Sequence, residues 1–147
     1  MERIHGHPIG RNWLRTSVAS RHKILGSLKE MILQMRTLHP ENTLVSSVNG
    51  GSLYDPRMPC STGRFGPFNN VQEFHDYLRN GIQAHSNHNA GLAKLINLHS
   101  QDWSGLTFTH GDLSSLDILV RGEEVVGIVD WETAGWYPSY WEYTAAC

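Results

Sequence analysis

The sequence predicts a single domain of the α+β class that is mostly helical. Apolar residues recur at steps of three and four early in the chain, which is the period of an amphipathic helix. Two shorter stretches share helical faces, and two β-branched runs late in the chain flank a polar turn. The length of 147 residues suits one domain, and a hydrophobic share of 39% suffices for one core.

The first predicted helix covers about residues 17–38. Thr16 or Ser17 can cap its start by accepting a hydrogen bond from a backbone N–H, and Pro40 cannot continue it. Its apolar face is formed by Ile24, Leu25, Leu28, Met31, Ile32, Met35 and Leu38.

Residues 40–69 change character, because Gly, Pro, Asn, Asp and Ser crowd between isolated apolar residues. We expect one long irregular loop here. Loops of this length inside a compact domain usually bind something or are disordered, and the aromatic side chains of Tyr54 and Phe65 argue against disorder. The loop is therefore predicted to line a pocket, in which Arg57 and Arg64 either clamp an anion or remain solvated.

Two shorter helices should follow this loop. Asn70 and Glu73 have the spacing of a capping box, which predicts a short helix that ends at Gly81. A further helix over about residues 87–99 is indicated by apolar residues at helical spacing. Its start is weakly specified.

A β-hairpin is predicted at the end of the chain. Ile118-Leu119-Val120 and Val125-Val126-Gly127-Ile128-Val129 flank the turn Arg121-Gly122-Glu123-Glu124, and Asp130 follows the second strand. Such a hairpin brings the residues before its first strand and after its second to one end.

The segment between Thr109 and Val120 contains the most informative motif. His110-Gly111-Asp112, with Asp117 five residues after Asp112, follows the kinase catalytic-loop pattern H-x-D-x-x-x-x-N before a strand, except that Asp stands where Asn is expected. After the hairpin come Asp130-Trp131-Glu132, Gly135-Trp136-Tyr137-Pro138 and Tyr140-Trp141-Glu142-Tyr143.

Together these motifs resemble the aminoglycoside phosphotransferase and choline kinase-like family, and most of all its fungal members. The resemblance implies that residues 1–147 form a protein-kinase-like C-lobe with a short β-hairpin after the catalytic loop. The catalytic loop and the hairpin would occupy residues 106–143. Residues 1–15 look like the start of the chain after the interlobe hinge. No Gly-rich phosphate loop and no strand-borne Lys with its helical Glu precede the motif, so the N-lobe is expected to be missing and the chain to be a truncated C-lobe.

The resemblance also implies roles for individual residues. Asp112 would orient or deprotonate an acceptor hydroxyl, Asp117 and Asp130 would hold Mg²⁺, and His110 would brace the loop. We therefore expect His110, Asp112 and Asp130 to be catalytic. The residues expected to bind substrate are Asp117, Trp131, Glu132, Arg57, Arg64 and Phe65.

Three hypotheses for the function remain open. In the first, the acidic cleft performs acid/base chemistry on a small metabolite, such as an isomerisation, cyclisation or elimination, without ATP or another cofactor. In the second, the chain is a phosphotransferase that uses Mg²⁺ and ATP and recovers its missing half from a partner chain or dimer mate. In the third, it is a pseudokinase-like binding module without catalytic activity.

The composition limits the partners. The formal charge is −2, with 12 basic and 14 acidic residues in small groups, so no basic stripe offers itself to nucleic acid. No run of roughly 18 apolar residues predicts a membrane span. Two cysteines indicate a reducing, cytoplasmic setting. The expected partners are a small-molecule substrate and a second copy of the chain, since a C-lobe alone would leave apolar surface uncovered.

Overall fold

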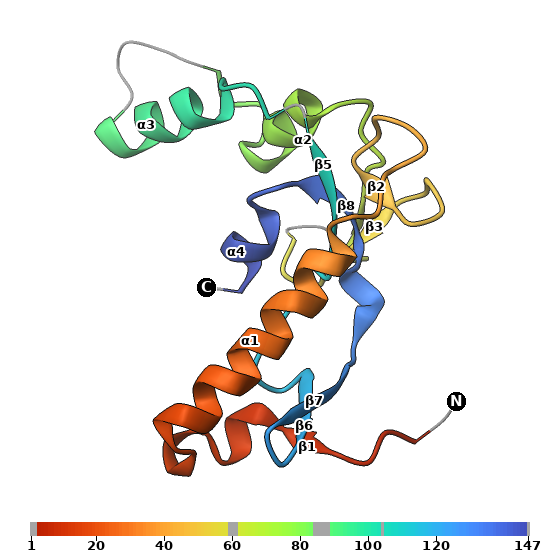
Figure 1. Ribbon diagram of the computed structural model, residues 1–147. Helices are drawn as coiled ribbons and strands as arrows, with labels where there is room; N and C mark the ends of the chain where they lie inside the picture. The colour runs from red at the N-terminus through yellow and green to blue at the C-terminus, as the bar shows by residue number, and fades with distance from the viewer. Residues whose placement is uncertain (1–2, 59–61, 84–88, 104, 147) are drawn as a thin grey trace.

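The computed structural model describes residues 3–58, 62–83, 89–103 and 105–146. Figure 1 shows the arrangement of its helices and strands. The α-helices of the described residues are Val18–Met35 (α1), Val71–Leu78 (α2), Ala90–His99 (α3) and Trp141–Ala145 (α4). Antiparallel strands and short 3₁₀ helices form the remaining regular structure, which agrees with the α+β class. Strands occupy more of the chain than the sequence predicted.

Helix α1 begins where the sequence predicted. The Ser17 hydroxyl accepts a hydrogen bond from the backbone N–H of Ser20 at 3.1 Å and so caps the helix. The helix ends at Met35, three residues earlier than expected, because the N–H groups of Thr37 and Leu38 bond carbonyls only three residues back and tighten the chain into a turn.

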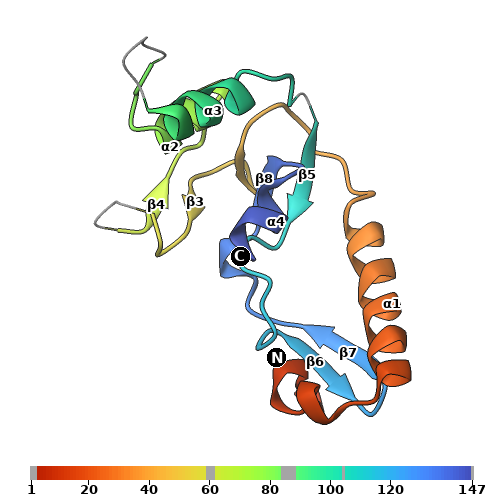
Figure 2. The same cartoon turned by 90° about the vertical axis from the view of Figure 1, so that its left-hand side faces the viewer.

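The predicted hairpin is confirmed. Strand β6 (Ile118–Arg121) pairs with β7 (Glu124–Ile128), and β1 (His7–Pro8) pairs with the other edge of β6. Helix α1 lies alongside this sheet (Figure 2). The 3₁₀ helix Ile9–Arg11 (η1) follows β1 and is succeeded by Trp13–Arg15 (η2). The buried residues of this first core are Ile9, Ile24, Leu28, Ile118, Val120 and Val125.

A second sheet leads into the motif that begins at His110. Strand β8 (Gly135–Pro138) lies between β5 (Leu106–Thr109) and β2 (Ser46–Ser47), all antiparallel. The prediction of one irregular loop over residues 40–69 is wrong in part, because β2, β3 (Leu53–Tyr54) and β4 (Arg64–Phe65) lie within it. Two-residue strands carry no readable alternation of apolar and polar residues, so the sequence pattern did not reveal them.

The second core lies beneath these strands and is rich in aromatic residues. Phe65 stacks on Tyr77 with ring centroids 5.5 Å apart, and Tyr137 stacks on Trp141 at 5.3 Å. Phe65 is only 5% exposed, so its side chain fills this core and is not presented to a substrate as the sequence suggested. The buried members are Val45, Leu53, Phe65, Phe74, Tyr137 and Trp141.

Asparagine side chains cap both short helices, and the cap of the first is the one that the sequence predicted. Asn70 accepts a hydrogen bond from the N–H of Glu73 at 2.9 Å, while the Glu73 carboxylate bonds the N–H of Asn69. Asn89 caps α3 in the same way, and residues 84–88, which include the predicted start of this helix, lie outside the described residues. None of the helices that the structure describes combines the length and the apolar composition needed to cross a bilayer.

Candidate functional site

The motif that begins His110-Gly111-Asp112 forms a tight turn between β5 and β6. Gly111 has a φ of +88°, a conformation that favours glycine. A Cβ atom at this position would lie 2.6 Å from the carbonyl oxygen of Thr133. The glycine is therefore required both by the backbone angle and by the close approach of the segment after the hairpin.

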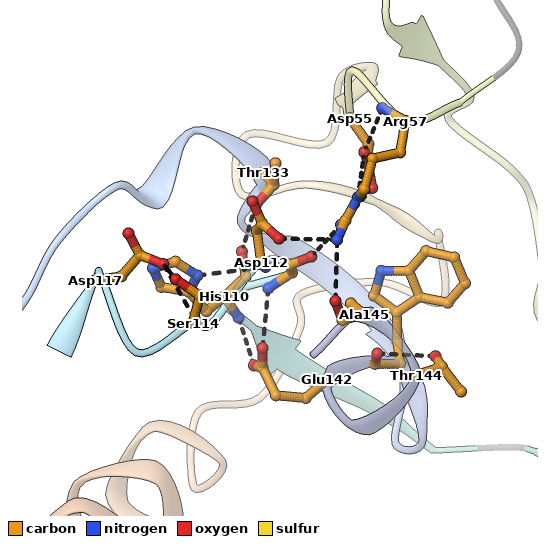
Figure 3. A network of polar contacts seen from close by, with 12 residues as sticks. Asp55, Arg57, His110, Asp112, Ser114, Asp117, Thr133, Glu142, Thr144 and Ala145 are labelled. Carbon is orange, nitrogen blue, oxygen red and sulfur yellow. Dashed lines mark hydrogen bonds and ion pairs between the residues drawn. The ribbon is translucent and has the colours of Figure 1, made fainter. Parts of the chain in front are cut away.

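His110 is buried and braces the turn (Figure 3). Its Nε2 lies 2.8 Å from the carbonyl oxygen of Val129, which can only accept, so Nε2 carries the proton. Nδ1 then accepts from the backbone N–H of Asp112 at 3.4 Å. The Thr133 hydroxyl donates to the carbonyl oxygen of His110 at 2.8 Å. The imidazole thus joins the turn to the end of the hairpin.

Glu142, near the start of α4, holds the same turn from the other side. Its carboxylate accepts hydrogen bonds from the N–H of His110 at 2.7 Å and of Gly111 at 3.2 Å, and the side chain is buried. Sequence reasoning gave Glu142 no role. The only signal was its place in the Tyr140–Tyr143 motif.

Asp112 projects from the turn and is exposed. Its Oδ1 accepts a hydrogen bond from Nη1 of Arg57 at 2.8 Å, and its Oδ2 accepts none from the described residues. Sequence reasoning placed Arg57 and Asp112 in one site but did not foresee that they bind each other.

Arg57 is in turn anchored by Asp55, a buried carboxylate that sequence reasoning missed. Nε and Nη2 of Arg57 donate to the two carboxylate oxygens of Asp55 at 2.9 and 2.8 Å. These bonds with Asp55 raise the pKa of Arg57 above its ordinary value, against a smaller opposing effect of desolvation. An Asp-x-Arg spacing is a weak signal, since most such pairs are solvated.

Asp117 and Asp130 lie at the same end of the hairpin, as predicted. The backbone carbonyl of Asp117 accepts from the N–H of Val129 at 2.9 Å. One carboxylate oxygen of Asp117 accepts from both the N–H and the hydroxyl of Ser114, at 3.0 and 2.5 Å. Asp130 has a φ of +66°, is exposed, and its carboxylate accepts no hydrogen bond from the described residues.

These two carboxylates are suited to Mg²⁺, which proteins usually bind through one or two carboxylates while substrate phosphates and waters complete its shell. Among the described residues, no protein group bonds the second carboxylate oxygen of Asp117 or either carboxylate oxygen of Asp130. Within the ranges that the structure describes, no group of three or more His, Cys, Asp or Glu side chains is placed to hold a metal without such a substrate.

Two other predicted substrate residues lie together in a polar hollow. Arg64 and Glu132 line a cavity of about 300 Å³ with Tyr54, and the Arg64 guanidinium lies 5.7 Å from the centre of the Tyr54 ring. Trp131 is partly exposed; its ring stacks on Phe108 and its Nε1 donates to the carbonyl oxygen of Ile128 at 2.9 Å.

Comparison with known proteins establishes the family. The model of the phosphotransferase enzyme family matches residues 1–147. The chain therefore belongs to the phosphotransferase enzyme family. No curated protein matches it.

Proposed function

We propose that the chain contributes the catalytic loop for phosphoryl transfer from a magnesium nucleotide to the hydroxyl group of a small molecule. Family membership supports phosphoryl transfer as the reaction class. The observation that carries the proposal is the hydrogen bond from Arg57 to Oδ1 of Asp112 at 2.8 Å, which holds an exposed carboxylate in place and leaves Oδ2 without a hydrogen bond from the described residues. A carboxylate so placed can accept a hydrogen bond from an acceptor hydroxyl and orient it for attack.

The remaining residues have supporting roles. His110 ties the backbone N–H of Asp112 to the carbonyl of Val129 at the end of the hairpin. Asp117 and Asp130 would hold Mg²⁺, which neutralises charge on the transferred phosphoryl group. The Ser114 hydroxyl orients one oxygen of Asp117 and leaves the other open.

The hypothesis of nucleotide-free acid/base chemistry has less support. It relied on crowding among three carboxylates, which would keep one of them protonated near neutral pH. Asp112 is instead paired with Arg57, which offsets the repulsion that the hypothesis needs. A carboxylate that Arg57 holds by one oxygen suits the orientation of a hydroxyl better than the abstraction of a proton from carbon.

We further propose that a second copy of the chain, or a partner chain, supplies the nucleotide-holding groups that the sequence does not reveal. Apolar surface next to the catalytic loop supports this assembly. Leu14 and Leu116 are 90% and 68% exposed, and a mostly apolar hollow of about 510 Å³ lies between η1, α1 and the catalytic loop. Light scattering should show a dimer at micromolar concentration, and a strictly monomeric mass would contradict the homodimer.

Binding of Mn²⁺ and ATP tests the proposed function directly. In NMR spectra, Mn²⁺ added with ATP should broaden the amide signals around Asp117 and Asp130, and Asp117→Ala and Asp130→Ala should each reduce the broadening. Transfer should be assayed with γ-labelled ATP and a panel of hydroxyl compounds that includes choline, homoserine and an aminoglycoside. Unchanged spectra at millimolar Mn²⁺ and ATP, together with no label transfer, would exclude the proposal.

A further inference from the structure

We infer that Arg57 is a positioning residue for Asp112. The buried carboxylate of Asp55 holds the guanidinium of Arg57, which in turn holds the exposed carboxylate of Asp112, and we call this arrangement the clamp. This inference rests on the proposed function, because it assigns Arg57 a role in orienting the acceptor hydroxyl through Asp112. It also replaces the expectation that Arg57 binds substrate.

The anchor end of this clamp is fixed within a short turn. Asp55 is 1% exposed, and its backbone N–H donates to the carbonyl of Gly63 at 2.8 Å. One of its carboxylate oxygens also accepts from the backbone N–H of Arg57 at 2.9 Å. With the two bonds from the guanidinium, the carboxylate of Asp55 accepts three hydrogen bonds from Arg57. The planar guanidinium therefore has a single orientation.

The other end of the clamp reaches two further segments. Nη1 donates to Oδ1 of Asp112 at 2.8 Å and to the carbonyl of Ala145 at 3.0 Å, and Nη2 donates to the carbonyl of Gly111 at 2.7 Å. Figure 3 shows the guanidinium between Asp55, the catalytic turn and the end of α4. Arg57 thereby joins the segment after β3 to the catalytic turn and to α4.

All five guanidinium N–H groups are thus bonded to protein acceptors, the full number that arginine can donate. A substrate anion could bind Arg57 only by displacing one of them. This complete use of donors distinguishes a positioning role from anion binding.

Asp112 needs such support because its side chain is 54% exposed and would otherwise sample several rotamers. The clamp holds Oδ1 and leaves Oδ2 for the acceptor hydroxyl. A misplacement of about 1 Å in a reacting group can reduce rate roughly 10²-fold. Lysine cannot substitute, because an ammonium group cannot reproduce a planar fork that meets Asp55, Gly111 and Asp112 together.

The geometry can be tested without turnover, by NMR of the guanidinium group in the full chain. Bonded Nη–H groups should give resolved signals at low temperature, assigned by their loss in Arg57→Lys. Asp112→Asn should shift the Nη1 signals and leave the Nε signal in place. Nη1 signals that do not respond to Asp112→Asn would refute the clamp. Arg121→Gln, which changes an exposed arginine on the hairpin, serves as the control.

Kinetics then test the positioning role. Arg57→Gln should lower kcat for label transfer about 10- to 100-fold and leave KM for MgATP within about twofold. Compared with Arg57→Gln, Arg57→Lys should recover more of the parent's thermal midpoint than of its kcat. Asp112→Asn combined with Arg57→Gln should be little worse than Asp112→Asn alone, since the arginine acts through that carboxylate. Multiplicative losses, or a rise in KM with unchanged kcat, would overturn the inference.

The two proposals can fail separately. If the parent chain transfers no label but Asp112→Asn moves the Nη1 signals, the proposed function fails and the clamp stands as structure only, so Arg57 has no catalytic positioning role. If label is transferred and Arg57→Gln is as active as the parent, the proposed function stands and the inference is wrong.

Discussion

Glu142 accepts a hydrogen bond from the backbone N–H of His110 at 2.7 Å, so the first turn of α4 is tied directly to the catalytic turn. Both side chains are buried, and the other oxygen of Glu142 accepts from Gly111. Hydrogen bonds to an ionised group are stronger than neutral ones, and two of them meet on one carboxylate. The shape of the turn therefore depends on a residue more than thirty positions later in the chain.

Replacement of Glu142 should reveal this dependence. Glu142→Gln keeps one carbonyl acceptor but turns an amide NH₂ toward a backbone N–H, so one bond is lost and two donors face each other. The free energy of unfolding should fall by about 2–3 kcal/mol, measured by urea denaturation. Glu124→Gln, at an exposed carboxylate on the hairpin, should change it by less than about 0.5 kcal/mol. Equal effects of the two substitutions would show that the bonds to the turn contribute little.

A stacked histidine pair should make the stability depend on pH. The rings of His75 and His99 lie 4.0 Å apart and nearly parallel, and both are buried. Burial is the main cause that lowers both pKa values, and it lowers that of His99 to about 4. The neighbouring Arg79 lowers them further, whereas Asp76 opposes this, and the Tyr140 hydroxyl bonds Nε2 of His75 at 2.6 Å.

The sign follows from proton binding. Above about pH 6.5 both histidines are neutral in the folded and in the unfolded chain. Below this pH the unfolded chain binds protons at these histidines, whereas the folded chain does not. Stability should therefore fall as the pH drops from about 6.5 to 4, by roughly 2–3 kcal/mol from His99. The measurement is a series of urea titrations at successive pH values.

His99→Phe isolates this contribution from that of the carboxylates. The phenyl ring preserves the stack and removes Nδ1, which is buried without a hydrogen-bond partner among the described residues. The variant should lose much of the slope between pH 6.5 and 4, whereas His22→Gln on the exposed face of α1 should retain it. A parent-like slope in His99→Phe would place the pH dependence elsewhere.

The catalytic aspartates should respond differently to amide substitution. Asp112→Asn preserves shape but removes the charge that orients the acceptor and accepts its proton, so label transfer should fall roughly 10²- to 10⁴-fold. Asp117→Asn restores the residue usual in the kinase pattern, and its carbonyl oxygen can still accept from Ser114, so its effect should be smaller. If Asp117→Asn abolishes transfer and Asp112→Asn does not, the roles are assigned to the wrong carboxylates. Circular dichroism of both variants checks folding.

The sequence predicted those parts of the fold whose signals are local. The apolar period and the Ser17 cap located α1, and two β-branched runs located the hairpin. Strands β2, β3 and β4 were missed because each is two residues long and is stabilised by its tertiary partner; Ser46, for example, pairs with Trp136. Such pairing overrides local preference and leaves no periodic pattern.

The residues of the candidate site likewise fall into those with a local sequence signal and those that depend on tertiary contacts. His110, Asp112 and Asp117 were found because they stand at fixed spacing in one short motif. Asp55 and Glu142 act through contacts with residues far away in sequence, and neither spacing nor composition distinguishes a buried carboxylate from a solvated one. Phe65 was misassigned for a related reason, since an aromatic side chain in a loop-like stretch can either line a pocket or fill a core.

The turn at Gly111 allows a prediction with a matched control in the same chain. Gly111 and Gly122 both have positive φ, +88° and +65°, so alanine carries a similar backbone penalty of about 1 kcal/mol at either position. Their surroundings differ: an added Cβ meets the Thr133 carbonyl oxygen at 2.6 Å at Gly111, but nothing within 4 Å at Gly122. Gly111→Ala should therefore lower the free energy of unfolding by roughly 3 kcal/mol or more, against about 1 kcal/mol for Gly122→Ala.

The clash in Gly111→Ala pushes apart the turn and residue 133, so the bond from the Thr133 hydroxyl to His110 should break. The amide signal of Asp112 should then shift in NMR spectra. Thr133→Ser keeps the hydroxyl and also the clashing carbonyl, and combined with Gly111→Ala it should give no rescue. Similar losses in Gly111→Ala and Gly122→Ala would mean that backbone strain alone sets the cost and that the approach of Thr133 is not close enough to matter.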